Sequence, residues 1–89
     1  MRARATRRFR RCFESLPPDI QDQARRAFAM WRANPSHPSL RFKRIHASQR
    51  VYSARIGRGW RALCLVEDDE AVWFWVGSHA DYERLIAGL

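Results

Sequence analysis

The chain has 89 residues, of which 17 are Lys or Arg and nine are Asp or Glu, so its formal net charge at pH 7 is +8. Hydrophobic residues make up 46% and aromatic residues 12%, which suffices for a folded core and excludes a disordered polycation. This length predicts one domain over residues 1–89 and excludes a multidomain enzyme.

The composition also bears on compartment, metals and partners. No apolar run approaches the ~20 residues of a membrane span, and no apolar stretch follows the basic N-terminus, so we expect a cytoplasmic protein. Cys12 and Cys64 are far apart, and no histidine shares a short motif with either, which predicts reduced, buried thiols, no metal site and no cofactor. The positive charge indicates a polyanionic partner, either nucleic acid or an acidic protein.

Two amphipathic helices are expected first. Thr6 is a plausible N-cap, and Pro17 and Pro18 end the first helix and open the second, which stops at Asn34. The apolar stripe of the first helix is Phe9, Cys12, Phe13 and Leu16, and that of the second is Ile20, Ala24, Ala27, Phe28 and Trp31. The short connection predicts an antiparallel helical hairpin.

After Pro38 the apolar period changes to two, which predicts four strands in an antiparallel meander. A capping pattern from Ser78 to Asp81 then opens a short last helix. The predicted fold class is therefore α+β, with the helical hairpin packed on a four-stranded antiparallel sheet and a short C-terminal helix. The expected strands are residues 39–46, 50–57, 60–67 and 71–77.

The predicted sheet has two unlike faces if residues 47–49 and 57–59 form three-residue loops. One face is apolar and packs on the helices, whereas the other carries Arg41, Lys43, Arg55 and Arg61, with Arg55 directly opposite both Arg41 and Arg61. Opposed like charges destabilise a sheet, so the cluster indicates a bound anion such as phosphate, although a solvated basic face is the plainer alternative. A two-residue loop at 58–59 would instead put Arg55 and Arg61 on opposite faces.

A four-residue loop at 67–70 places Arg61 opposite Val76 and brings His79 beside Arg61. His79 is then a candidate acid or base, and Tyr82 a candidate for base stacking or proton donation; the alternatives are a solvated helix residue and a core residue. Without a Gly-rich phosphate loop or a carboxylate cluster, the remaining chemistry is metal-free RNA cleavage. The 2′-hydroxyl is then the nucleophile, and the protein supplies proton transfer and cations.

Three segments carry a resemblance to a known family: HPSLRFKRI (37–45), YSARIGRGWRAL (52–63) and WFWVGSHADYERLI (73–86), supported by LPPDIQDQA (16–24) and WRANP (31–35). Over nearly the whole chain they resemble the RelE/ParE toxin superfamily. The resemblance implies a RelE-like α+β fold, a bacterial type II toxin and an acidic cognate antitoxin. RelE-like members cleave mRNA on the ribosome without a metal, inhibiting translation.

Matched by motif, the resemblance implies that Arg61 is a phosphate-binding arginine, that His79 and Tyr82 lie in the catalytic C-terminal segment, and that Arg41 and Lys43 lie on a strand of family cations. Together with the strand pairing, which adds Arg55, this predicts catalysis by Arg61, His79 and Tyr82 and binding of RNA phosphates by Arg41, Lys43 and Arg55. Two features depart from the pattern. Pro38 and Ser39 stand where some members carry a glutamate base, and residues 1–5 do not read as the usual first strand. Two alternatives stay open: a ParE-like inhibitor of DNA gyrase, and a non-toxic relative that binds nucleic acid.

Overall fold

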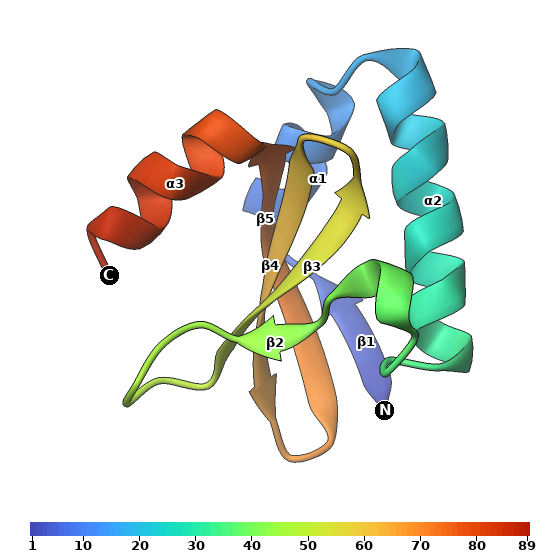
Figure 1. The fold of residues 1–89 in the computed structure, drawn as a ribbon. Coiled ribbons are helices and arrows are strands. Elements are labelled where there is room, and N and C mark those ends of the chain that lie inside the picture. Colours follow the sequence, from blue (N-terminus) through green and yellow to red (C-terminus); the bar gives the residue numbers. More distant parts are fainter.

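The computed structural model describes residues 1–89 and consists of one five-stranded sheet with helices on both faces (Figure 1). The strand order is β1-β5-β4-β3-β2, in which β1 is parallel to β5 and the other neighbours are antiparallel. The strands are β1 Arg2–Ala5, β2 Lys43–Arg44, β3 Val51–Gly57, β4 Trp60–Glu67 and β5 Glu70–Ser78. The helices are α1 Arg7–Glu14, α2 Pro18–Ala33, the 3₁₀ turn η1 Pro38–Leu40, and α3 His79–Ala87.

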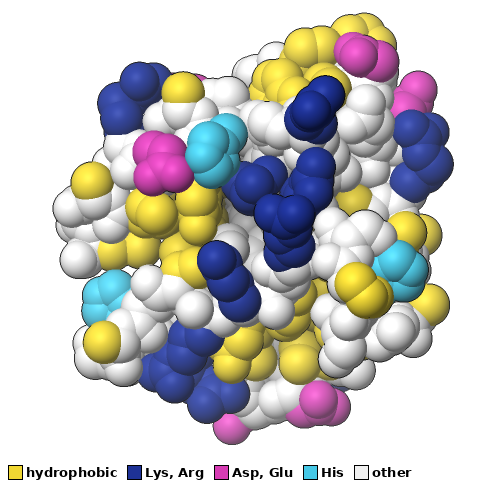
Figure 2. All heavy atoms as spheres, viewed as in Figure 1, with side chains coloured by type: hydrophobic (Ala, Val, Ile, Leu, Met, Phe, Trp, Pro, Cys, Tyr) yellow, Lys and Arg dark blue, Asp and Glu magenta, His cyan; other side chains and the backbone are white.

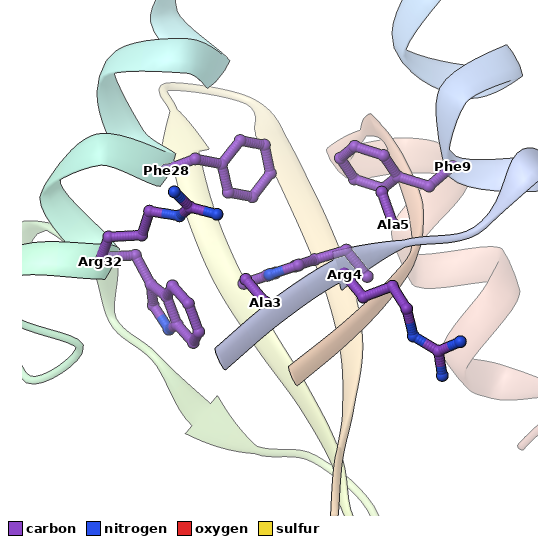
Figure 3. Close-up of a pocket in the computed structure, with 8 residues that line it drawn as sticks. Ala3, Arg4, Ala5, Phe9, Phe28 and Arg32 are labelled. Carbon is purple, nitrogen blue, oxygen red and sulfur yellow. The ribbon is translucent and has the colours of Figure 1, made fainter. Parts of the chain in front are cut away.

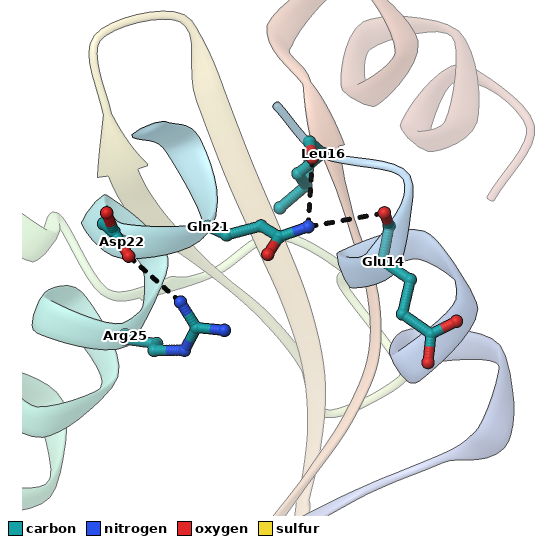
Figure 4. Close-up of polar contacts among 5 residues, drawn as sticks. All are labelled: Glu14, Leu16, Gln21, Asp22 and Arg25. Atoms are coloured by element: carbon teal, nitrogen blue, oxygen red, sulfur yellow. Dashed lines mark hydrogen bonds and ion pairs between the residues drawn. The ribbon is translucent and has the colours of Figure 1, made fainter. Parts of the chain in front are cut away.

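Helices α1 and α2 begin where the sequence predicts and α2 also ends there, whereas α1 ends at Glu14, before the predicted stripe residue Leu16. The Thr6 hydroxyl accepts a hydrogen bond from the Phe9 backbone at 3.1 Å, and α2 opens at Pro18. The side-chain amide of Gln21 stabilises the connection between them. Its Nε2 donates to the backbone carbonyls of Glu14 and Leu16 at 3.3 and 3.1 Å (Figure 4). The turn between the helices is therefore fixed by both proline geometry and side-chain hydrogen bonds.

The two helices do not form a clear hairpin, which corrects the prediction. Helix α1 packs mainly on β5, whereas α2 packs mainly on β3. They meet through side chains at Phe9 and Phe28, whose ring centroids lie 5.5 Å apart. Each apolar stripe faces the sheet, since the sheet offers more apolar surface than the other helix does.

The predicted four-stranded antiparallel sheet is wrong at its N-terminal edge. Residues Arg2–Ala5 form β1, which pairs in parallel with β5 from Arg2 opposite Glu70 to Ala5 opposite Trp73. Ala3 and Ala5 are half-buried while Arg2 and Arg4 are exposed, so the strand does alternate. Local pattern could not indicate it, because Ala and Arg have little strand preference and the pairing partner lies about 70 positions away.

The strand predicted over residues 39–46 is also largely absent. Residues 38–40 form η1, and only Lys43 and Arg44 pair with β3. Pro38 fits the start of a 3₁₀ turn, and the left-handed backbone of Arg41 then interrupts the extended conformation that the predicted strand needs. The predicted register of the remaining pair, Lys43 opposite Ser53, is confirmed.

The main core lies between the sheet and helices α1 and α2. The aromatic ring of Trp73 on β5 packs edge-on against Phe28 and Trp31 of α2, with centroids 4.9 and 5.3 Å apart. Its other buried members include the predicted apolar face of the sheet: Leu40, Ala54, Ile56, Ala62, Cys64 and Val66. Burial raises the pKa of Cys64 to about 12, whereas Cys12, also predicted to be buried, is only half-buried.

Beside β1, the helices leave an apolar groove of about 260 Å³ (Figure 3). In it Phe9 and Phe28 point toward each other from α1 and α2. On the opposite face of the sheet, α3 covers a smaller cluster of Val51, Leu63, Trp75 and Tyr82. No helix is both long enough and apolar enough to span a bilayer.

Candidate functional site

A basic cleft of about 280 Å³ opens on the face of the sheet that α3 partly covers. Figure 2 shows Lys and Arg side chains gathered at the centre of this face, beside a histidine. The basic cleft is lined by Arg41, Lys43, Ser53, Arg55, Arg61, His79, Tyr82, Glu83 and Ile86. All six side chains singled out from the sequence are therefore brought together, although they come from four separate segments of the chain.

The β3–β4 hairpin presents Arg55 and Arg61 on the same face. The turn is the two-residue form, with Gly57 opposite Trp60, and not the predicted three-residue loop. A β-bulge between Arg55 and Gly57 absorbs the extra residue, so Arg55 still pairs directly with Arg61. The predicted pairing is thus confirmed, but through a compensation that the sequence pattern did not indicate.

Arg41 reaches the basic cleft by an unusual backbone geometry. It follows η1 in the left-handed region, with φ 46° and ψ 42°, and it does not pair with Arg55 as predicted. A non-glycine residue in this region carries a backbone cost of about 1 kcal/mol. The turn nevertheless brings this guanidinium to the cations of β3 and β4, beside the half-buried Phe42.

Arg61 is the most strongly perturbed cation of the basic cleft. Burial lowers its pKa from the usual range, and the positive charges of Arg55 and Arg41 lower it further, while Tyr82 and Glu83 act in the opposite direction. Its Nη1 donates to the carbonyl of Trp60 at 2.9 Å, which fixes the guanidinium. An arginine stays protonated even so, and a held, partly desolvated guanidinium is well suited to bind an oxyanion.

None of the four cations in the basic cleft has an ion-pair partner. The ion pair between His79 and Glu83 lies in the cleft lining, and the other salt bridges of the molecule lie outside it. Four mutually repelling cations beside a single carboxylate, which already pairs with His79, leave an excess of positive charge that an anion would neutralise.

His79 is held at the first position of α3. Its backbone N–H donates to the Gly59 carbonyl at 2.7 Å, which ties the helix start to the β3–β4 turn. Its Nε2 lies 3.0 Å from Glu83 Oε1, and its ring lies 5.7 Å from that of Tyr82 between centroids. The predicted cap is confirmed, since the Ser78 hydroxyl accepts from the Asp81 backbone at 3.1 Å.

The partner strand of Arg61 differs by one residue from the prediction. Arg61 pairs with Gly77 and not with Val76, because the β4–β5 ladder shifts register between Leu63 and Cys64. The turn at residues 68–69 is also shorter than the predicted four-residue loop, and both aspartates there have positive φ. Val66 still faces Ala71, as predicted. Because Gly77 pairs with Arg61, α3 starts beside Arg61.

Tyr82 is a core residue, which was one of the two alternatives left open by the sequence. It is buried in the smaller cluster with Val51 and Leu63, and it also lines the basic cleft. Sequence reasoning missed three lining residues: Ser53, Glu83 and Ile86. Glu83 had a usable signal, since it lies four positions after His79 on a predicted helix. The described residues contain no group of three or more His, Cys, Asp or Glu side chains that could hold a metal ion.

The fold defines a small α+β protein of the RelE type, as comparison with solved structures confirms. The chain is similar to RelE in the RelB–RelE antitoxin–toxin complex of Methanococcus jannaschii, with a TM-score of 0.74, 16% identity, and coverage of 92% of this chain and 96% of that one. It is similar to YafQ from Escherichia coli BL21(DE3), with a TM-score of 0.73, 11% identity, and coverage of 92% and 98%. It is also similar to a chain of the RelBE2 toxin–antitoxin complex of Mycobacterium tuberculosis, with a TM-score of 0.69, 26% identity, and coverage of 86% and 95%.

Sequence comparison identifies the family. The family model described as the ParE-like toxin domain matches residues 18–84. A search among curated proteins finds no match. The chain belongs to the ParE-like toxin domain family, within the RelE/ParE toxin superfamily.

Proposed function

We propose that this chain is the toxin of a type II toxin–antitoxin system and that it cleaves mRNA on the ribosome without a metal ion. One observation carries the proposal: four cations without ion-pair partners converge with His79 in a single cleft of about 280 Å³. Cations in this arrangement bind phosphate, and a histidine beside them can serve as a proton donor or acceptor.

The reaction that these groups support is transesterification within the RNA. The 2′-oxygen attacks the adjacent phosphorus and loses its proton to a base, and the bond from phosphorus to the 5′-oxygen breaks as that oxygen gains a proton. The products are a 2′,3′-cyclic phosphate and a 5′-hydroxyl. Negative charge grows on the non-bridging oxygens in the transition state, where preorganised cations are most effective.

Each side chain then has a defined part. Arg55 and Arg61 bind the reacting phosphate. His79 serves as the acid or base of the reaction, and its Nε2 lies 3.0 Å from Glu83 Oε1. Arg41 and Lys43 bind neighbouring phosphates. Tyr82 lines the same cleft, where it stacks on a nucleobase or donates a proton.

An acidic antitoxin is the expected protein partner, in keeping with the toxin–antitoxin complexes among the similar structures. A net charge of +8 favours an acidic chain electrostatically. The antitoxin would neutralise activity by covering the basic cleft, whose four cations form no ion pairs within the protein.

The experiment is induction in bacteria followed by mapping of mRNA 5′ ends. We expect cuts within translated messages for the native chain. Arg61→Ala and His79→Ala should each lower cleavage about 100-fold, the usual effect of losing an oxyanion donor or an acid–base group. Arg8→Ala is the matched control, because Arg8 is exposed on α1 and lies outside the basic cleft. Full cleavage by both cleft variants would reject this site.

A second candidate is inhibition of DNA gyrase, because the family model that matches is the ParE-like one. Growth arrest with intact mRNA and stalled gyrase–DNA complexes would support it. A chain that binds RNA in a salt-dependent way, with neither arrest nor cleavage, would instead be the non-toxic nucleic-acid-binding relative.

A further inference from the structure

Ser53 is the one polar or charged residue among the 21 buried residues of the molecule. Its relative exposure is 3%, yet its hydroxyl makes no hydrogen bond within the protein. Trp31 Nε1 is the only fully buried side-chain polar atom that lacks a partner, so the Ser53 hydroxyl keeps a small contact with solvent. The hydroxyl is therefore free of partners within the protein and open to whatever molecule fills the space beside it.

The surroundings of Ser53 identify where its hydroxyl is exposed. Ser53 lies on β3 between Lys43 of β2 and Leu63 of β4, and its side chain lines the basic cleft. Arg55 lies two residues further along β3, on the same face as Ser53, and it pairs with Arg61. The hydroxyl therefore lies among three cations on the floor of the basic cleft.

The chemistry of this position favours one kind of ligand. The neighbouring Lys and Arg side chains are donors only, so they provide no acceptor for the hydroxyl proton. A phosphate held by the cations would bring acceptor oxygens to the floor. The small side chain also leaves the floor open, whereas a long one would occupy the space between Lys43 and Arg61.

We propose that Ser53 is a substrate-binding residue whose hydroxyl donates a hydrogen bond to a non-bridging oxygen of the RNA phosphate held by Arg55 and Arg61. This inference rests on the proposed function and adds a neutral donor to its cations. A hydrogen bond to a charged oxygen is stronger than one between neutral groups.

The test measures binding of a 2′-O-methyl RNA pentanucleotide, which has no free 2′-hydroxyl and cannot be cleaved. Fluorescence anisotropy with the full chain should give about tenfold weaker binding for Ser53→Ala than for the native protein. Thermal unfolding of Ser53→Ala should stay within a degree or two of the native value, because no hydrogen bond inside the protein is lost. Ser36→Ala, on an exposed loop residue, is the control and should change neither quantity.

The outcomes separate this inference from the proposed function. If Arg61→Ala weakens binding and Ser53→Ala does not, the role of Ser53 is overturned and the RNA site stands. A clear fall in melting temperature for Ser53→Ala with unchanged affinity would assign the residue a structural role and also overturn the inference. If Arg61→Ala too binds the oligonucleotide like the native chain, both the RNA site and the inference fail.

Discussion

At the scale of single residues, Arg41 shows how the basic cleft is built against local preference. Its φ of 46° is unfavourable for any side chain, and its guanidinium lies among charges of the same sign. Neither feature stabilises the fold. The proposed binding of a phosphate gives both features a physical reason, since strained backbone gathers at functional sites.

Replacing Arg41 separates its backbone cost from its charge. Arg41→Gly should raise the free energy of unfolding by about 1 kcal/mol over Arg41→Ala, because glycine adopts the left-handed region without a Cβ clash. Both variants should lose RNA affinity equally, because both lose the guanidinium. Chemical denaturation and oligonucleotide binding measure the two effects. A glycine variant less stable than the alanine variant would contradict the strain.

Glu83 should fix the tautomer of His79. With Nε2 3.0 Å from the carboxylate, neutral His79 should carry its proton on Nε2 and leave Nδ1 as the acceptor. Imidazole ¹⁵N shifts measure this directly, and Glu83→Ala should remove the preference. We expect cleavage by that variant to fall about tenfold, by analogy with carboxylates that orient histidines. Identical ¹⁵N shifts in both proteins would rule out the role.

At the scale of elements, the β3–β4 hairpin determines the geometry of the basic cleft. Its bulge keeps Arg55 opposite Arg61, and its turn residue Gly59 accepts the backbone N–H of His79 at 2.7 Å. One hairpin thus positions two phosphate-binding candidates and the start of the helix that carries the acid–base candidate.

Gly59→Ala tests the hairpin. Gly59 has φ +78°, and a Cβ there would meet no atom within 4 Å, so the only effect is backbone strain. We expect a loss of about 1 kcal/mol in the free energy of unfolding, measured by urea denaturation. Gly88→Ala is the control, since φ there is −93° and its Cβ would make an ordinary contact. Equal stability of the two variants would argue against strain at Gly59.

The elements also differ in how far sequence could predict them. The helices followed from apolar stripes and from caps at Thr6 and Ser78, because those signals lie within a few residues. Strand β1 and the two-residue β2 did not follow, since their existence depends on β5 and β3. The prediction of a helical hairpin was wrong for the same reason, because each helix contacts the sheet more than it contacts the other helix.

At the scale of the whole molecule, the net charge of +8 should make RNA binding depend on salt. If the four cations of the basic cleft each displace one counterion from single-stranded RNA, the slope of log Kobs against log salt concentration is about −3. Anisotropy titrations with the 2′-O-methyl pentanucleotide from low to physiological salt measure it. Arg61→Ala should make the slope less steep by roughly 0.7, and Arg8→Ala should leave it unchanged. A slope near zero would exclude electrostatic binding of the phosphates.

The sequence by itself determined the helices, the apolar face of the sheet, the basic character and the identity of the six candidate side chains. These features depend on local period, composition and short motifs, which folding does not alter. The opposition of Arg55 and Arg61 was also predicted, but on a loop length that proved wrong.

Only the tertiary structure decided how those side chains meet. The bulge after Arg55, the left-handed turn at Arg41 and the parallel strand β1 depend on strand pairings formed across the chain. The same holds for Ser53 on the cleft floor and for Glu83 beside His79 in the cleft wall. Burial and the absence of a hydrogen-bond partner are properties of packed surroundings, and no spacing in the sequence contains them.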